Sequence, residues 1–328
     1  MEQATSLSLL ETEVAIKFIK DTFERELAKS LNLTRVSAPL FVYPESGLND
    51  NLNGYERAVR FDVLTLGKEV EIVQSLAKWK RMALAKYGFA MGSGLYTDMN
   101  AIRRDETLDA LHSVYVDQWD WEKIISENDR KYSYLKKTVR QIYKSLYKLS
   151  LAVAKKYPYL KTDLPKDITF VSTKELERLY PDKNRKQREN AITKKYGAVF
   201  IYQIGWPLSD GQSHDGRSAD YDDWKLNGDI LLWYDKLSLA LEISSMGIRV
   251  DAKSLIKQLN HKKEYNKINN PYCQDVINNR LPLTIGGGIG QSRLCMFFLK
   301  KSHIGEVQSS VWDEQSVNSL AEQGIRLL

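Results

Sequence analysis

The chain has 328 residues, of which 43% are hydrophobic and 27% are charged, and its formal net charge is +6, as expected for a soluble globular protein. Because it has only two cysteines, Cys273 and Cys295, and no run of about 18 apolar residues, we exclude a disulfide scaffold, a cysteine-based zinc site and a membrane-spanning helix. Acids stand at the start of the chain where a secretion signal would carry positive charge, so we expect a cytoplasmic protein.

The first half of the chain predicts two helices and several strands. Residues 13–31 carry apolar side chains at helical spacing, with Thr12 in the N-cap position. Residues 35–42 predict an extended segment, which Pro39 restricts to a sheet edge or a strand end. The elements predicted after this segment are strands at 58–64, 69–73 and 112–120 and a helix at 78–86.

The second half begins with a long predicted helix at residues 129–156, which Pro158 ends. The other predicted elements are helices at 174–180, 185–196 and 289–300 and strands at 199–204, 229–233, 239–244 and 283–285. Strands follow one another more often than they alternate with helices, which favours an antiparallel sheet flanked by helices over a parallel doubly wound sheet. We therefore predict an α+β fold in a single domain over residues 1–328.

Positive charge is concentrated in residues 131–195, which contain 18 Lys or Arg against 6 Asp or Glu. Such a segment can attract polyanions, including nucleic acid. Lysines dominate it, however, and no aromatic and basic motif accompanies them, which favours solvated helix faces. We therefore do not expect a nucleic-acid partner.

A glycine cluster, GGGIGQSR at residues 286–293, is the first indication of a binding site. It lacks the Gly-Lys-Ser/Thr end of a P-loop and the spacing of a dinucleotide fingerprint. Glycines let a flat ligand lie against the backbone, and Arg293, close behind them, can reach phosphates. A glycine-rich helix start with a surface arginine explains the pattern equally well.

A second polar cluster is EISSMGIR, residues 242–249. Its Glu242, its two hydroxyls and Arg249 suit a magnesium–phosphate group beside a carboxylate. Asp229, on the neighbouring predicted strand, offers a second oxygen ligand, because Mg²⁺ binds one or two carboxylates together with substrate phosphates. Asp229 and Glu242 are therefore the predicted metal ligands.

Two further charged clusters precede the predicted strand that carries Gln118 and Asp120. In QSLAKWKR, residues 74–81, a serine and then a lysine span a strand-to-helix turn, which suits recognition of a carboxylate. A solvated helix residue is the alternative for Lys80. The second cluster is RRDE, residues 103–106, a charged loop before the strand.

Together these clusters resemble the catalytic core of class II aminoacyl-tRNA synthetases, and most closely the aspartate–ammonia ligases, the ammonia-dependent asparagine synthetase A family. The family strings HSVYVDQWDW, SLAKWKR, LNGDI, ELSSMGIRVD and TIGGGIGQSRL recur at residues 112–121, 75–81, 226–230, 242–251 (with Ile243 in the leucine place) and 284–294. The similarity runs over nearly the whole chain. The segments around Lys80 and Glu242 also resemble the aspartate-recognition segments of aspartyl-tRNA synthetases.

The resemblance implies nucleotide ligands. Arg103 would be the arginine of the second class II motif, which holds the α-phosphate of ATP. Arg293 would be that of the third motif, beside the adenine ring and the outgoing phosphates. The other implied ligands of the nucleotide are Asp229, Glu242, Ser245 and Arg249, of which the two acids would also hold Mg²⁺.

The resemblance also implies an aspartate pocket, made of Ser75, Lys80, Gln118, Asp120 and Ser244. Lys80 and Arg103 would act in catalysis by neutralising charge. Asp50 and Asp222 would lie at the amide-forming end. Pro39 would belong to the first motif, which builds a homodimer in this class.

The implied reaction is the ATP-dependent amidation of L-aspartate by ammonia. The β-carboxylate attacks the α-phosphorus of ATP and forms β-aspartyl adenylate and pyrophosphate, because an amide cannot form at neutral pH with oxide as the leaving group. Ammonia then displaces AMP and gives asparagine. Catalysis of such a step consists of positioning and charge neutralisation, which explains the many cationic side chains.

Ammonia poses a second chemical problem, since at pH 7 it is nearly all ammonium. A buried carboxylate with a raised pKa can bind ammonium and take its proton. Asp50, Asp120 and Asp222 are candidates; Asp120 is better suited to the substrate ammonium, which leaves Asp50 or Asp222. An ordinary turn former is the alternative for Asp50. Glutamine is disfavoured as nitrogen donor, since no cysteine is paired with a base.

Two alternatives share this fold: an aspartyl- or asparaginyl-tRNA synthetase, and a non-catalytic paralogue that binds tRNA. The class II segments begin almost at residue 1, which leaves no space for an anticodon-binding β-barrel of about 100 residues. The matched charged residues argue against the paralogue, which would be free to lose them. The resemblance therefore favours the ligase.

Overall fold

The computed structural model describes residues 7–50, 52 and 56–328. Most of its strands form one sheet, in the order β1 (Leu33–Arg35), β5 (Gly94–Ile102), β6 (Tyr115–Ile124), β11 (Thr284–Gly290), β10 (Leu239–Arg249), β9 (Asp222–Tyr234), β8 (Ala198–Tyr202) and β7 (Thr169–Ser172). The outermost pairs, β1–β5 and β7–β8, are parallel. The inner pairs are antiparallel, so the predicted α+β fold with a mainly antiparallel sheet is confirmed.

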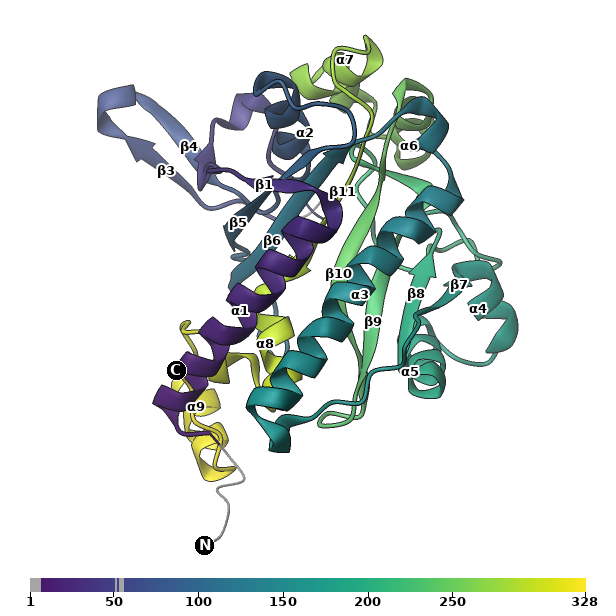
Figure 1. The fold of residues 1–328 in the computed structure, drawn as a ribbon. Coiled ribbons are helices and arrows are strands. Elements are labelled where there is room, and N and C mark those ends of the chain that lie inside the picture. The colour runs from purple at the N-terminus through teal and green to yellow at the C-terminus, as the bar shows by residue number, and fades with distance from the viewer. Residues whose placement is uncertain (1–6, 51, 53–55) are drawn as a thin grey trace, which may run out of the picture.

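Two long helices, α1 (Leu9–Leu31) and α3 (Tyr132–Lys156), lie side by side across one face of the sheet (Figure 1). The remaining α-helices are α2 (Ala77–Lys86), α4 (Thr173–Leu179), α5 (Arg185–Tyr196), α6 (Ala252–Lys262), α7 (Pro271–Ile277), α8 (Gln291–Leu299) and α9 (Glu314–Glu322). Among the residues described, no helix has the length and apolar character needed to cross a membrane.

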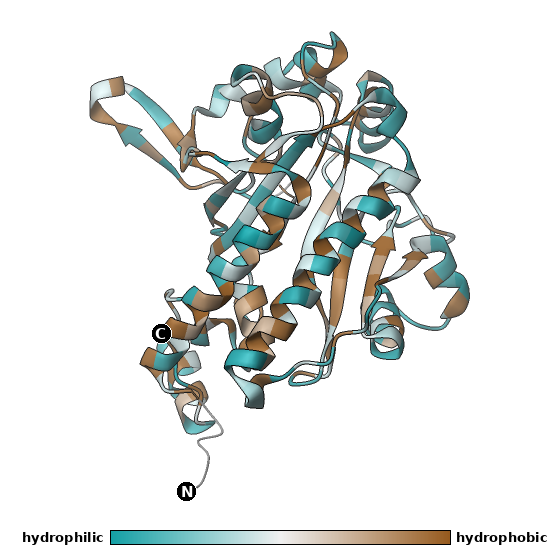
Figure 2. Cartoon of the chain, in the orientation of Figure 1, coloured by the Kyte–Doolittle hydropathy of each residue, from teal (hydrophilic) through white to brown (hydrophobic). Residues whose placement is uncertain are grey.

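The main hydrophobic core lies between the sheet and the helices α1, α3 and α8. Trp119 and Trp121 of β6 are buried there, and the ring of Phe23 from α1 lies 5.1 Å from the ring of Trp119. Figure 2 shows hydrophobic and hydrophilic residues alternating along α1 and α3, as in helices that bury one side only. Side chains alternate between the faces of a strand, so Asp120, which lies between these tryptophans, points to the opposite face.

A small sheet of order β2 (Phe41–Val42), β4 (Lys68–Ile72) and β3 (Arg60–Val63) projects from the body of the molecule (Figure 1). Adjacent strands in this sheet are antiparallel. The strands predicted at 58–64 and 69–73 correspond to β3 and β4. Phe41 and Phe61 form an edge-to-face pair, with 5.5 Å between ring centroids.

Three predictions about local structure were wrong. The first helix begins at Leu9 rather than residue 13, because Ser8 and Glu11 form a capping box that satisfies the first backbone N–H groups. Strand β5 was missed, since it is buried on both faces and so lacks the alternation of a half-buried strand. The glycine cluster is the body of strand β11 and not a helix start; the following helix begins at Gln291.

The basic segment forms α3, α4, α5 and the strand β7 between them. Part of its charge is paired within the protein: Lys148 binds Glu26, and Lys186 binds Glu189. The ammonium group of Lys136 lies 4.5 Å from the ring centre of Tyr132. These contacts agree with solvated helix faces.

Replacement of Phe23 by Ala should reveal how much the α1–sheet contact contributes to stability. Because Phe23 is fully buried, we expect F23A to lower the free energy of unfolding by about 3–5 kcal/mol, measured by urea denaturation. Leu10, on the same helix but 76% exposed, is the control, and L10A should cost less than about 1 kcal/mol. Equal losses in the two variants would contradict the described packing.

Candidate active site

A cavity of about 480 Å³ opens on the face of the sheet opposite the main core. Most of the residues singled out from the sequence line its wall, although they come from distant segments. Those on the wall are Ser75, Lys80, Arg103, Gln118, Asp120, Asp222, Glu242, Ser244, Ser245, Arg249 and Arg293. Asp50 and Asp229 are buried beside the cavity and are not part of its wall.

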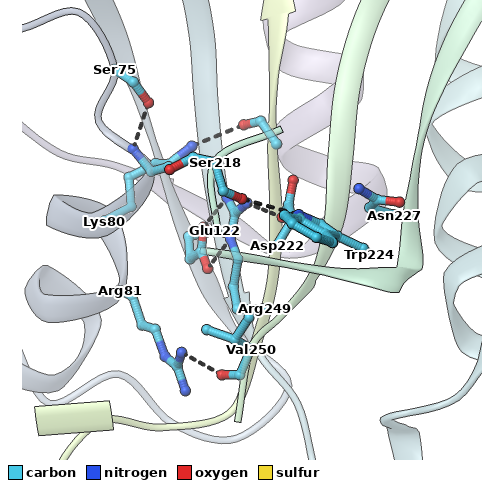
Figure 3. A network of polar contacts seen from close by, with 12 residues as sticks. Ser75, Lys80, Arg81, Glu122, Ser218, Asp222, Trp224, Asn227, Arg249 and Val250 are labelled. Atoms are coloured by element: carbon cyan, nitrogen blue, oxygen red, sulfur yellow. Dashed lines mark hydrogen bonds and ion pairs between the residues drawn. The ribbon is translucent and has the colours of Figure 1, made fainter. Parts of the chain in front are cut away.

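One end of the cavity contains a buried ion pair. The ammonium of Lys80, on α2, lies 3.1 Å from a carboxylate oxygen of Asp120 and donates a hydrogen bond of 3.0 Å to the carbonyl of Gly287. Burial lowers the pKa of Lys80, although the charge of Asp120 raises it. Ser75 fixes the start of α2, because its hydroxyl accepts a hydrogen bond from the backbone N–H of Ala77 (Figure 3). We call this region the inner end.

The glycine cluster provides space for the side chains of the inner end. A Cβ atom at Gly288 would lie 2.2 Å from the amide oxygen of Gln118 and 2.7 Å from a carboxylate oxygen of Asp120. A Cβ at Gly286 would lie 1.9 Å from a carboxylate oxygen of Glu122. These glycines therefore lie under polar side chains of the neighbouring strand, which is a different reason for glycine from the flat ligand that the sequence suggested.

Arg249, on β10, lies deeper and is held by two acids, one on the adjacent strand β9 and one on β6, two strands away. One of them, Glu122, is fully buried and was missed from the sequence. The signal was present: Gln118, Asp120 and Glu122 alternate along β6 and must share a face. The other is Asp222, whose pKa is raised by burial although Arg249 lowers it.

The opposite end of the cavity, which we call the outer end, contains arginines that are less enclosed. Arg293 donates a hydrogen bond of 3.2 Å to the carbonyl of Glu242, and its side chain is 25% exposed. Arg103 lies 4.0 Å from Glu106 and is equally exposed. Arg217 was missed from the sequence; it lines the cavity and pairs with Asp229.

The acids proposed as metal ligands lie close enough to influence each other. Burial raises the pKa of Asp229 to about 7; Arg217 lowers it and the charge of Glu242 raises it. One oxygen of Asp229 is buried and has no hydrogen-bond partner among the described residues. Two carboxylates with a free oxygen fit Mg²⁺ if phosphates complete its shell. The described residues contain no cluster of three or more His, Cys, Asp or Glu that could hold a metal alone.

Asp50 lies behind the inner end. Its carbonyl accepts a hydrogen bond of 3.1 Å from the side-chain amide of Gln74, which lines the cavity. Burial raises the pKa of Asp50 to about 6; Lys78 lowers it and Asp220 raises it. Asp50 is thus bound through its backbone to a residue of the cavity wall and does not itself line the cavity.

Several polar atoms in the cavity wall have no partner within the described residues. They include the hydroxyl of Ser244, the amide oxygen of Gln74 and the Nε atom of Arg103. Because an unpaired buried polar group costs free energy, these atoms indicate where a ligand would bind. A buried cation and anion at the inner end suit a zwitterionic amino acid, and arginines at the outer end suit a polyphosphate.

Comparison with known sequences gives one consistent result. The family model described as aspartate-ammonia ligase matches residues 10–324. A curated aspartate–ammonia ligase from Clostridium perfringens is 58% identical over 323 residues, which are 98% of this chain and 96% of the relative. Another, from Fusobacterium nucleatum, is 57% identical over 328 residues and the full length of both chains.

Solved structures show the same fold at much lower identity. Asparaginyl-tRNA synthetase from Pyrococcus horikoshii, complexed with asparaginyl-adenylate, has a TM-score of 0.67 at 16% identity and covers 92% of this chain and 70% of its own. The corresponding enzyme from Entamoeba histolytica, also with asparaginyl-adenylate, has a TM-score of 0.66 at 13% identity, and this chain spans only 66% of its length. The predicted class II synthetase fold is therefore confirmed.

Because Asp50 is buried with a raised pKa, it should make stability depend on pH. Between about pH 4 and pH 6 the folded protein keeps this proton while the unfolded chain has lost it. The Asp50 contribution therefore destabilises the protein as the pH rises through this window. We expect D50N to be more stable than the wild type at pH 7.5, by up to about 3 kcal/mol, and less so at pH 4.5. Urea denaturation at both pH values measures this, and an equal difference at both would contradict it.

Proposed function

The chain belongs to the aspartate–ammonia ligase family, and from this premise we propose how its cavity divides the reaction among its residues. The reaction is the ATP-dependent conversion of L-aspartate and ammonia to L-asparagine, through an adenylate. This reaction is supported by a cavity that has a buried Lys80–Asp120 ion pair at one end and arginines at the other. The buried Lys80–Asp120 pair beside the unpaired hydroxyl of Ser244 carries the assignment.

We propose that the inner end binds L-aspartate. Its ammonium would bind Asp120 and Gln118, and its carboxylates would bind Lys80 and the hydroxyls nearby. Each substrate charge would then meet an opposite charge in a buried site, where such hydrogen bonds are strong. The hydroxyls assigned to this task are those of Ser75 and Ser244.

The outer end would bind ATP. Arg103 would neutralise the α-phosphate during attack, and Arg293 would lie beside the adenine and the departing pyrophosphate. Ser245 would bind the nucleotide where the two ends meet. Asp229 and Glu242 would hold Mg²⁺, which as a bound cation neutralises phosphate charge.

Attack by the β-carboxylate oxygen on the α-phosphorus forms one P–O bond and breaks the bond to the β-phosphate, releasing pyrophosphate. Charge builds on the transferring group as this occurs, and the arginines of the outer end compensate it. Ammonia then attacks the acyl carbon, a C–N bond forms, and the acyl C–O bond to AMP breaks. The nitrogen loses two protons between ammonium and the neutral amide, so a base is needed.

We propose Asp50 or Asp222 as the base that takes the first proton from ammonium. Both are buried, and the pKa of each is raised above its usual value by burial, which makes a carboxylate a better proton acceptor. Asp222 lines the cavity, whereas Asp50 does not, although its backbone carbonyl accepts a hydrogen bond from Gln74 of the cavity wall.

We further propose that the protein is a cytoplasmic homodimer with one catalytic domain. Exposed apolar side chains next to Pro39 and in the turn between β3 and β4 support a subunit interface that includes the small sheet: Leu40, Phe41 and Leu64 are 49%, 43% and 91% exposed. Light scattering at several concentrations measures the subunit number, and a monomer would contradict the proposal.

The whole assignment is tested by incubating the protein with ATP, Mg²⁺ and L-aspartate, with ammonium in one sample and glutamine in another. We expect asparagine, AMP and pyrophosphate with ammonium, and none with glutamine. ADP in place of AMP would overturn the adenylate route. Omission of Mg²⁺ should stop turnover.

Replacement of an outer-end charge should reduce turnover without unfolding the protein. We expect R293A and E242Q each to lower kcat about 10²- to 10³-fold, since each removes a group that stabilises transition-state charge. Arg280, which is 59% exposed and pairs with Asp275 outside the cavity, provides the control R280A. Near-native turnover in R293A or E242Q would show that its role is assigned wrongly.

The base for ammonium can be identified by separating the two half-reactions. Loss of the base should leave aspartate-dependent exchange of labelled pyrophosphate into ATP nearly unchanged, while asparagine formation falls about 100-fold or more. D50N and D222N are compared with D163N, whose side chain is 82% exposed. If neither variant separates the half-reactions, both aspartates are excluded as the base.

A further inference from the structure

The guanidinium of Arg249 forms hydrogen bonds with two acids on different strands, Glu122 and Asp222 (Figure 3). Its Nε and Nη2 atoms donate hydrogen bonds to the two oxygens of Glu122, the shortest being 2.7 Å and 2.9 Å. Its Nη1 atom donates to Asp222 at 2.5 Å. One edge of the guanidinium is therefore fully used by Glu122, and the remaining nitrogen is bound to Asp222.

Glu122 is built into the protein interior and does not line the cavity. Its side chain has no exposed surface, and the absence of a side chain at Gly286 leaves the space that it occupies. Burial raises the pKa of Glu122, but Arg249, Lys80 and Thr284 together hold the pKa below its usual value. The charged form of Glu122 is thus favoured beside Arg249.

Asp222 differs from Glu122 in its position at the cavity, in the number of hydrogen bonds it accepts from Arg249 and in its pKa. It lines the cavity together with Arg249 and Lys80, and a single hydrogen bond joins it to the guanidinium. Burial raises its pKa, in contrast to that of Glu122. The carboxylate of a ligand in the cavity could take the place of Asp222 at Nη1, whereas it cannot reach the edge that Glu122 covers.

The position of Arg249 also decides what it can bind. Its charge lies close enough to Lys80 to lower the pKa of that residue, so both cations belong to the inner end. Arg103 and Arg293 form the outer end. Arg249 thus faces the region assigned to L-aspartate.

We propose that Glu122 is a positioning residue, which holds Arg249 so that its Nη1 atom exchanges Asp222 for a carboxylate of L-aspartate. This inference rests on the proposed function of the inner end. The exchange leaves Asp222 free of its ion pair in the occupied site. Without Glu122, Arg249 would turn towards Asp222, the other acid that its guanidinium binds among the described residues, and would bind the substrate less well.

The variant E122Q tests this role, because glutamine keeps the shape of the side chain and removes its charge. We expect the KM for L-aspartate to rise about 10- to 100-fold, the effect of losing one charged hydrogen-bond partner, while the KM for ATP stays within about threefold. Calorimetric titration of the protein with L-aspartate should show the same loss of affinity without turnover.

A matched control is E71Q. Glu71 is also buried and pairs with an arginine, Arg60, at 3.1 Å, but it lies in the small sheet outside the cavity. E71Q should leave both KM values within about twofold of the wild type, even if it lowers the melting temperature as much as E122Q does.

The variant G286A provides a second test that keeps the charge of Glu122. A Cβ there would lie 1.9 Å from the Glu122 carboxylate and 2.6 Å from Nη2 of Arg249, so the pair must separate. We expect the same selective rise in the KM for L-aspartate.

The outcomes are distinct. If folded E122Q keeps the wild-type KM for L-aspartate, or if both KM values rise equally, Glu122 has only a structural role and the proposal is overturned. If the wild type makes no asparagine at all, the proposed function fails; the calorimetric comparison of E122Q with E71Q then still decides whether Glu122 positions Arg249.

Discussion

The buried ion pairs on the cavity face of the sheet are the constraint on which the rest of the structure depends. Lys80 with Asp120, and Arg249 with Glu122 and Asp222, place five charged groups where water does not solvate them. Removing one partner of such a pair costs several kcal/mol because the other charge is left unpaired. Strands β6, β9 and β10, which carry four of the five, are therefore held in one register.

The hydrophobic core and the cavity lie on opposite faces of the sheet, and side chains of strand β6 point alternately to one and the other. On β6, the tryptophans at 119 and 121 enter the hydrophobic core under α1. Gln118 and Asp120 line the cavity on the opposite face, and Glu122 lies on that face beneath the cavity wall. Glycines on β11 leave the space for these polar side chains. Alternate residues of one strand thus form the core and the cavity face. A shift of one residue in the strand pairing would turn the tryptophans towards the cavity and the polar side chains towards the core.

This arrangement connects stability with function. Under the proposed function, L-aspartate would take the place of some contacts within the cavity wall. The single hydrogen bond between Arg249 and Asp222 is such a contact, and the unpaired hydroxyl of Ser244 can form a new one. The bidentate contact of Glu122 is not such a contact, because it lies beneath the cavity wall. The difference between exchangeable and permanent contacts allows a charged site to be both stable and able to bind.

The sequence by itself determined the family, the α+β class and most of the charged side chains that carry the proposed reaction, because long motif strings and strand alternation are local properties of the chain. It did not reveal Glu122 or Arg217, or why Gly286 and Gly288 are glycines, although Glu122 could have been found from its spacing to Asp120. It placed Asp50 at the amide-forming end, and only the folded chain shows that Asp50 does not line the cavity. These features depend on which side chains from distant segments meet. Ion pairs such as Arg249–Glu122, 127 residues apart, form only when the strands pair, so tertiary structure alone decided them.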